Sequence, residues 1–192
     1  ASATQENPPP GHETSPVAAV PDVERHSPGT GVPFLGKAEA KQTLTFFIDY
    51  QCPVCPRAAR EMPALIASFG GLLKVEIKHN PLAMHRQALD AAAASRAAQR
   101  QGKFWEYHDL LLDSRRLDRD ALLALADRAG LSREAFQKDF DDAGLRQEIM
   151  EEAREAERAG AIGTPGFLIN GHAETGWASL SWLQSVVRSH LK

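Results

Sequence analysis

The sequence predicts an α/β fold in which a block of helices separates two strand-containing segments. Three observations predict this fold class: a strand–helix–strand pattern over residues 44–78, a stretch without strand signals over about 83–160, and a strand pair followed by a helix over 167–191. A right-handed crossover through the first helix allows the first two strands to pair in parallel. The chain of 192 residues is long enough for one domain with its own hydrophobic core.

The first half begins with an apolar run at residues 44–50, which is expected to form a strand. This run ends directly before the only two cysteines of the chain, Cys52 and Cys55. A helix is expected from Cys52 to about residue 69. Residues 72–78 alternate in polarity and include β-branched side chains, which predicts the second strand.

Four helical segments are expected in the middle of the chain. Asp118 and Ser132 are suitable N-caps, and Gly102, Gly130 and Gly160 are suitable terminators. The expected helices span residues 84–101, 103–113, 118–129 and 132–160, the last with a break near Gly144.

The second half begins at an apolar run, residues 167–169, followed by Asn170-Gly171. Asn-Gly is the favoured two-residue turn of a hairpin, so a second antiparallel strand is expected at about residues 172–176, and a helix at 179–191. Pro165 stands where the first of these strands begins. Because proline cannot donate to the ladder, it is expected to serve another purpose there.

Residues 1–31 differ in composition from the rest of the chain. They are rich in Pro, Ser, Thr, Gly and Glu and contain few large apolar side chains. Such a segment buries too little surface to offset its loss of conformational entropy, so we expect a disordered tether over 1–31 and a folded domain over 32–192. The tether contains no signal peptide, and it could join the domain to a membrane anchor or to another domain.

The two cysteines form a C-x-x-C motif that is suited to disulfide exchange. At a helix N-terminus, free backbone amides and the helix dipole favour a thiolate at Cys52, and Cys55 is placed to resolve a mixed disulfide. Two other uses of the motif are weaker. A structural disulfide would close too short a loop to constrain the unfolded chain, and a zinc site with His79 and His85 lacks the spacing of a zinc finger.

Four ordered segments resemble the DsbA-like branch of the thioredoxin superfamily, over about residues 32–192. They are P-F-L-G at 33–36, F-I-D-Y-Q-C-P at 47–53, G-K-F-W-E-Y-H-D-L-L at 102–111 and G-T-P at 163–165. The resemblance implies a thioredoxin fold with an all-helical insertion, about residues 83–160, between its βαβ and ββα halves. It also implies a cis bond before Pro165, facing the C-x-x-C motif, and a Thr164 backbone that binds extended substrate segments.

The chain departs from this family where many relatives carry a buried acidic residue before the first cysteine. That acid helps to move protons to and from the second cysteine, and here its position is Phe46. Asp49 does not replace it in the predicted strand, because period-2 alternation points its side chain to the other face.

The residues around the cysteines also depart from the Pro-His dipeptide of many relatives. Pro53 and Val54 are expected to tune the thiolate, but they place no imidazole over the Cys52 sulfur, and Pro56 removes an amide donor from the helix start. We therefore expect a Cys52 pKa below that of a free thiol, but less depressed than in Pro-His relatives.

Other polar and aromatic residues are expected to be structural. His79, His85 and His108 are interpreted as surface or hydrogen-bonded core residues. Trp105 and Tyr107 are expected to pack the helical insertion against the rest of the domain.

Composition excludes several classes of function. The formal net charge is −3, and basic residues alternate with acidic ones, so the sequence indicates no nucleic-acid surface. No apolar run approaches the roughly 20 residues of a membrane span. Two cysteines in one motif indicate a protein that is not itself held together by disulfides.

The expected function is thiol–disulfide exchange with protein substrates, as a DsbA-like oxidase. Cys52 is the exposed nucleophile, Cys55 resolves the mixed disulfide, and Thr164 and Pro165 position the substrate. No organic cofactor or metal is needed, and a redox partner must reset the pair. The resemblance implies a bacterial periplasm or cell envelope, and the short N-terminal segment offers no assembly domain, so a monomer is expected.

Two alternatives stay open at this point. One is a reductase or isomerase of the same fold. The other is a metal-tolerance protein that binds Cu(I) through Cys52 and Cys55, with Met62 and Met84 as possible neighbours, although methionine usually fills gaps in cores.

Overall fold

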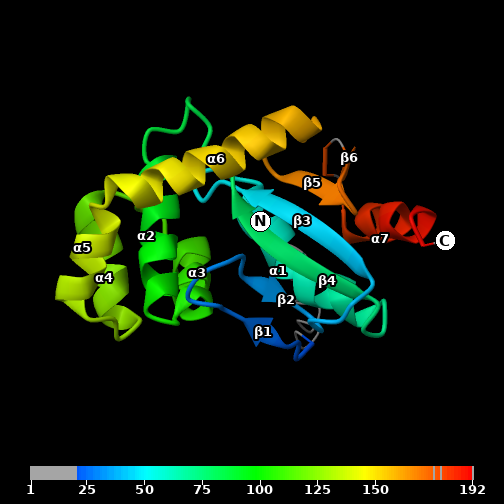
Figure 1. The fold of residues 1–192 in the computed structure, drawn as a ribbon, viewed down its shortest axis with the longest axis horizontal. Helices are drawn as coiled ribbons and strands as arrows, with labels where there is room; N and C mark the ends of the chain where they lie inside the picture. The colour runs from blue at the N-terminus through cyan, green and yellow to red at the C-terminus, as the bar shows by residue number, and fades with distance from the viewer. Residues whose placement is uncertain (1–20, 175, 178, 192) are drawn as a thin grey trace, which may run out of the picture.

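A six-stranded mixed sheet forms the centre of the computed structural model, which describes residues 21–174, 176, 177 and 179–191. The strands are Arg25–His26 (β1), Phe34–Leu35 (β2), Gln42–Ile48 (β3), Leu73–His79 (β4), Gly166–Ile169 (β5) and His172–Glu174 (β6). They lie in the order β1-β2-β4-β3-β5-β6 (Figure 1). Only β3 and β4 pair in parallel, so the predicted βαβ unit and terminal hairpin both lie in this sheet.

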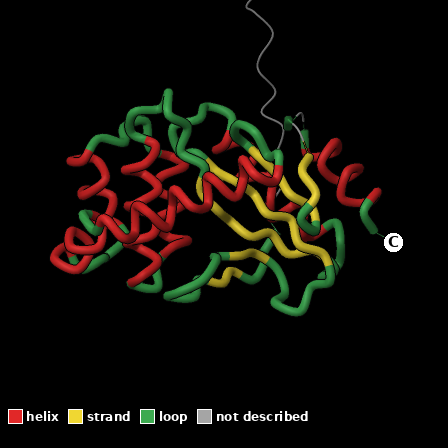
Figure 2. The backbone as a smooth tube through the Cα atoms, turned by 45° about the horizontal axis from the view of Figure 1, so that its top comes forward, coloured by secondary structure: helices red, strands yellow, loops and turns green. Residues whose placement is uncertain are grey.

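Seven helices surround the sheet in the described part of the chain. They are Cys55–Ala67 (α1), Ala88–Arg100 (α2), Phe104–Asp113 (α3), Arg119–Arg128 (α4), Arg133–Phe140 (α5), Ala143–Ala159 (α6) and Leu180–Ser189 (α7). Helices α2 to α5 gather beyond one end of the sheet, and α6 runs from this cluster across one sheet face (Figures 1 and 2). None of the described helices is both long and apolar enough to cross a membrane.

Alternating side chains of β3 bury both faces of the sheet. Phe46 belongs to the large core that also contains residues of α1, whereas Phe47 packs with Ala156 of α6 and with Leu168. Phe47 is paired with Gly166, the first residue of β5, in the antiparallel β3–β5 register. This register brings the start of β5 to the end of β3, where the cysteine loop begins.

The structure confirms the predicted order of elements and shifts several boundaries. Strand β3 ends at Ile48, and α1 starts at Cys55 rather than at Cys52. Helix α2 starts at Ala88, later than expected, because residues 80–87 form a loop. The expected break near Gly144 separates α5 from α6, and there the Asp142 side chain accepts a hydrogen bond from the Gly144 amide (2.8 Å).

The expected tether boundary at residue 31 is wrong for the part of this segment that the structure describes, residues 21–31. Residues Arg25–His26 form β1, and carbonyl oxygens of this segment accept side-chain hydrogen bonds from the helical insertion: His26 from Trp105 (3.0 Å) and Pro28 from Gln99 (2.6 Å). These partners lie far along the chain, so local composition does not reveal them. Residues 1–20 lie outside the described part.

Candidate active site

The two cysteines lie in different environments at the end of β3. Cys52 occupies a turn in which its amide donates to the Asp49 carbonyl (3.1 Å), and Cys55 is the first residue of α1. Cys55 is fully buried, whereas Cys52 is 5% exposed to solvent. Cys52 was expected to be an exposed nucleophile. It is the more accessible of the two, but the loop before β5 covers most of it.

That covering loop contains Thr164 and Pro165, and the peptide bond between them is cis. The Cys52 Sγ lies 3.4 Å from the Thr164 carbonyl oxygen. Gly163 has a φ of +86°, which side-chain-bearing residues rarely adopt, so glycine suits the approach to this turn. The structure therefore brings together the four residues Cys52, Cys55, Thr164 and Pro165 across more than a hundred positions of sequence.

The surroundings of Cys52 lower the pKa of its thiol to about 5. The largest cause is a hydrogen bond from the Cys55 side chain; burial acts in the opposite direction, and Thr164 and the amides of Val54 and Cys55 add further stabilisation of the thiolate. The amides act as the sequence predicted, but the neighbouring thiol, not the helix terminus, contributes most. At neutral pH Cys52 is thus a thiolate.

The pKa of Cys55 is shifted in the opposite direction. Its hydrogen bond to Cys52 and its burial raise the pKa of the Cys55 thiol. The pair therefore consists of one thiolate that can attack a disulfide and one thiol that keeps its proton. This is the division of roles that disulfide exchange needs.

The Thr164 side chain is among the groups that lower the pKa of Cys52. Its Oγ1 is buried and has no hydrogen-bond partner among the described residues. The hydroxyl is therefore available to donate to a Cys52 thiolate, in agreement with its part in lowering the pKa of Cys52.

Exposed apolar side chains lie on the segments around Cys52. Val54 is the N-cap of α1 and is 40% exposed. Met84 (79% exposed) is in the 80–87 loop, and Ile162 (83% exposed) precedes the Thr164 turn. Pro53 is also exposed. We name Val54, Met84 and Ile162 the apolar rim.

The position of the missing family acid is filled by a core side chain, as the sequence indicated. Phe46 is fully buried in the cluster that contains Cys55, and its ring stacks on Phe167 at 5.2 Å. Asp49, which sequence reasoning placed outside the site, is 1% exposed, and its carboxylate accepts from the Gln51 amide (2.8 Å) beside the cysteines. Strand alternation did not apply to it, because β3 ends one residue earlier.

His79 and His108 confirm the structural interpretation of these residues. His79 is fully buried between Glu152 (2.8 Å) and Ser95 (2.9 Å). His108 Nδ1 is 2.8 Å from the Tyr50 hydroxyl, and burial lowers the pKa of His108 to about 3, so that its ring is neutral. Neither histidine contacts a cysteine.

Trp105 and Tyr107 differ in what they pack against. Trp105 joins the insertion to the N-terminal segment, which the sequence had assigned to the tether, because its indole N–H donates to the His26 carbonyl (3.0 Å). Tyr107 instead packs within the insertion, where its hydroxyl donates to the Leu122 carbonyl (2.8 Å).

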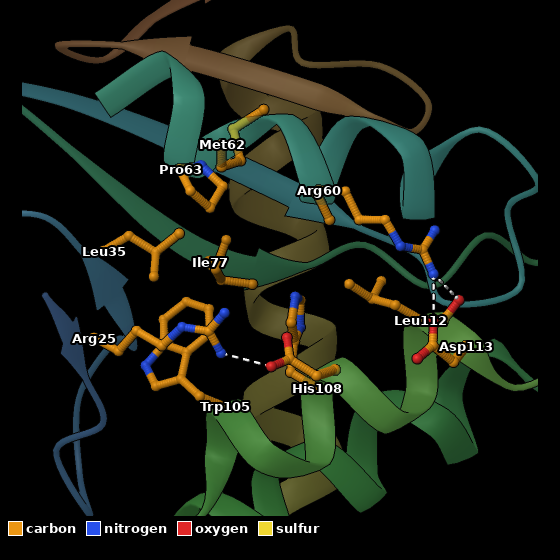
Figure 3. Close-up of a pocket in the computed structure, with 12 residues that line it drawn as sticks. Arg25, Leu35, Arg60, Met62, Pro63, Ile77, Trp105, His108, Leu112 and Asp113 are labelled. Carbon is orange, nitrogen blue, oxygen red and sulfur yellow. Dashed lines mark hydrogen bonds and ion pairs between the residues drawn. The ribbon is translucent and has the colours of Figure 1, made fainter. Parts of the chain in front are cut away.

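A separate cavity of about 350 Å³ lies between α1, β4 and α3 (Figure 3). Its walls are mainly apolar, and two ion pairs flank it: Arg25 with Asp109, and Arg60 with Asp113, each at 2.6 Å. No residue of the cysteine motif or of the Thr164 turn lines it. The cavity is therefore separate from the cysteine pair and the Thr164 turn.

The residues that the Cu(I) alternative would use are dispersed. Met62 is 1% exposed in the core and Met84 projects into solvent. Within the described residues, no three side chains of His, Cys, Asp or Glu gather in a metal-binding group. A copper site would thus rest on the two cysteines alone.

Comparisons with known proteins agree with this geometry. A family model described as thioredoxin matches residues 29–188. A thioredoxin-like oxidoreductase from Silicibacter pomeroyi DSS-3 has a TM-score of 0.75 and 29% sequence identity, over 83% of this chain and 91% of that one. The thiol-disulfide exchange protein alpha-DsbA2 from Wolbachia pipientis shares the fold, with a TM-score of 0.71 and 21% identity over 83% and 87% of the two chains.

Curated relatives of similar sequence are much longer proteins. The chain is 35% identical over 156 residues to Na(+)/H(+) antiporter NhaA 1 of Salinispora arenicola (strain CNS-205). That match covers 80% of this chain but 24% of the antiporter, so the chain spans about a quarter of the length of this relative.

Proposed function

The chain belongs to the thioredoxin family, and from this premise we propose that it is a DsbA-like thiol–disulfide oxidoreductase that donates the Cys52–Cys55 disulfide to protein substrates. One observation carries the proposal: the pKa of Cys52 is lowered to about 5, while that of its neighbour Cys55 is raised. A structural disulfide needs no such asymmetry between its two thiols.

The reaction runs through a mixed disulfide. A substrate thiolate attacks Cys52 Sγ of the oxidised pair, the Cys52–Cys55 bond breaks, and Cys55 leaves and takes up a proton. A second substrate thiolate then attacks the first substrate sulfur, and Cys52 leaves as a thiolate. Two electrons pass from the substrate to the cysteine pair, and the substrate gains one disulfide.

The leaving groups support oxidation as the proposed direction. Cys52 leaves readily because its surroundings stabilise the thiolate, and this same stabilisation favours the reduced form of the pair. A pair whose reduced form is stabilised gives its disulfide away. In a reductase the thiolate is less strongly stabilised, as in thioredoxin, whose nucleophilic cysteine has a pKa of about 7.

Protein substrates fit the surface around the site. The apolar rim presents Val54, Met84 and Ile162 to solvent on the cysteine motif, the 80–87 loop and the segment before the Thr164 turn. Exposed apolar groups that frame a reactive sulfur suit unfolded chains, whose side chains are not yet buried. The Thr164 backbone is proposed to align an extended substrate segment next to Cys52.

We place this activity in an extracytoplasmic compartment, where disulfides persist, and expect a monomer that a separate redox partner reoxidises. Light scattering tests the monomer, and a mass at the dimer or trimer would reopen the isomerase alternative.

The reduction potential of the pair, measured in glutathione buffers, tests the direction. We expect a value between about −120 and −180 mV, and oxidation of a dithiol peptide that stops in Cys52→Ser. A value near about −270 mV would replace the oxidase with a reductase. Tight Cu(I) binding without disulfide exchange would instead support the copper alternative.

A further inference from the structure

Asp49 is a buried carboxylate next to the cysteine motif that the exchange reaction does not use directly. One carboxylate oxygen accepts from the Gln51 amide (2.8 Å), and the other accepts from the Leu82 amide (3.0 Å) and lies 2.7 Å from His85 Nδ1. The backbone of Asp49 also takes part, because its carbonyl accepts from the Cys52 amide (3.1 Å). A single residue thus joins the cysteine turn to the loop between β4 and α2.

That loop, residues 80–87, contacts both halves of the active site. At its far end the Gln87 amide donates to the Gln51 side chain (2.7 Å). At its start the Asn80 side chain donates to the carbonyl of Gly163 (3.2 Å), directly before the Thr164 turn. The loop therefore connects the cysteine turn with the Thr164 turn, the two segments that meet at Cys52, and we call it the 80–87 strut. Asp49 binds the middle of this loop through Leu82 and His85.

The charge of Asp49 also reaches the cysteine pair. After the hydrogen bond to Cys52 and burial, the charge of the Asp49 carboxylate is a smaller cause that raises the pKa of the Cys55 thiol, whereas the backbone of Asp49 lowers that pKa by hydrogen bonding. His85, which is 80% buried at its side chain, is the only ionisable side chain that is hydrogen-bonded to the carboxylate among the described residues. The carboxylate charge of Asp49 is therefore offset only by its own hydrogen-bond donors.

We propose that Asp49 is a positioning residue for disulfide exchange: its buried carboxylate holds the 80–87 strut against both active-site segments and acts electrostatically on the cysteine pair. The proposal rests on the proposed function for its purpose. The effect of Asp49 on the dithiol–disulfide equilibrium of the cysteine pair can be measured without any protein substrate.

Glu152 provides a matched control in the same chain. Its carboxylate is also buried, also lies 2.8 Å from a histidine Nδ1, and also accepts a backbone amide, both from His79. None of its partners belongs to the cysteine motif, the 80–87 loop or the Thr164 turn. Loss of either carboxylate should destabilise the fold, but only loss of Asp49 should alter the cysteines.

The test compares Asp49→Asn with Glu152→Gln by urea unfolding and by equilibration of the cysteine pair with glutathione. We expect both to unfold at lower urea, and Asp49→Asn alone to shift the equilibrium several-fold toward the dithiol, because the carboxylate charge that opposes a thiolate at the neighbouring Cys52 is gone. Equal potentials in wild type and Asp49→Asn, or an equal shift in Glu152→Gln, would overturn the proposal.

His85 variants give a second reading if Asp49→Asn does not fold. His85→Ala removes the donor that faces the carboxylate, so the less compensated charge should shift the equilibrium toward the disulfide, opposite to Asp49→Asn. His85→Gln retains an N–H donor and should stay near wild type. A shift of the same sign in His85→Ala and Asp49→Asn would contradict the electrostatic role. Absence of peptide oxidation in the wild type would refute the proposed function and leave these potentials to decide the role of Asp49.

Discussion

Replacement of Thr164 by valine tests whether the Thr164 hydroxyl stabilises the Cys52 thiolate. The substitution keeps the shape of the side chain and removes its only donor. A hydrogen bond to a charged group contributes about 1.5–3 kcal/mol, and one pKa unit corresponds to about 1.36 kcal/mol. The pKa of Cys52, about 5 in the wild type, should therefore rise to between about 6 and 7 in Thr164→Val.

The assay is the ultraviolet absorbance of the thiolate as the reduced protein is titrated with base. Cys55 does not interfere, because its pKa is raised and only Cys52 ionises in the acidic and neutral range. Thr164→Ser keeps the hydroxyl and should titrate like the wild type. Identical midpoints for Thr164→Val and wild type would show that the hydroxyl is not a donor, and a wild-type midpoint near the ordinary ~8.5 would refute the account of the site as a whole.

Three further predictions concern pH, packing and substrate binding. The pKa of Cys52 is lowered in the folded state, so the free energy of unfolding of the reduced protein should rise as the pH is raised from about 5 to about 9, and fall as the pH is lowered over the same range. The disulfide form, measured by the same urea unfolding, should show no such change. Met62→Ala should reduce the free energy of unfolding by about 2–5 kcal/mol because this side chain is 1% exposed, while Met84→Ala should leave unfolding unchanged; equal losses would contradict the burial of Met62. Met84→Ser and Ile162→Ser should raise the KM for an unfolded protein and leave the rate with a small thiol unchanged, and an unaltered KM would exclude the apolar rim from substrate binding.

Local sequence signals predicted much of the fold correctly. The Asn170-Gly171 turn has positive φ at both residues, 50° and 84°, as an Asn-Gly hairpin requires. Asp118 and Ser132 cap their helices as expected, with side chains that accept from the third residue along. In each case the interaction spans only a few residues, so composition and spacing contain the whole signal.

The two short strands β1 and β2 were missed for the opposite reason. Each of these strands has only two residues, which is too short a run to show periodicity. Phe34–Leu35 pairs with β4, and Arg25–His26 pairs only with β2. Their stability comes from neighbours in the sheet and from Trp105 and Gln99 of the insertion. Such partners are distant in sequence and invisible to a window of adjacent residues.

The sequence by itself determined the chemistry of this protein: a C-x-x-C motif after a strand, a Gly-Thr-Pro turn before another, and the family that combines them. Only the tertiary structure decided how reactive the pair is and what surrounds it. The Cys52 pKa depends on the Cys55 thiol and the Thr164 side chain, and Asp49 is buried next to the cysteine motif because β3 ends before it. Bond chemistry is a property of residue types, whereas burial and charge interactions depend on which distant atoms the fold brings within a few ångströms.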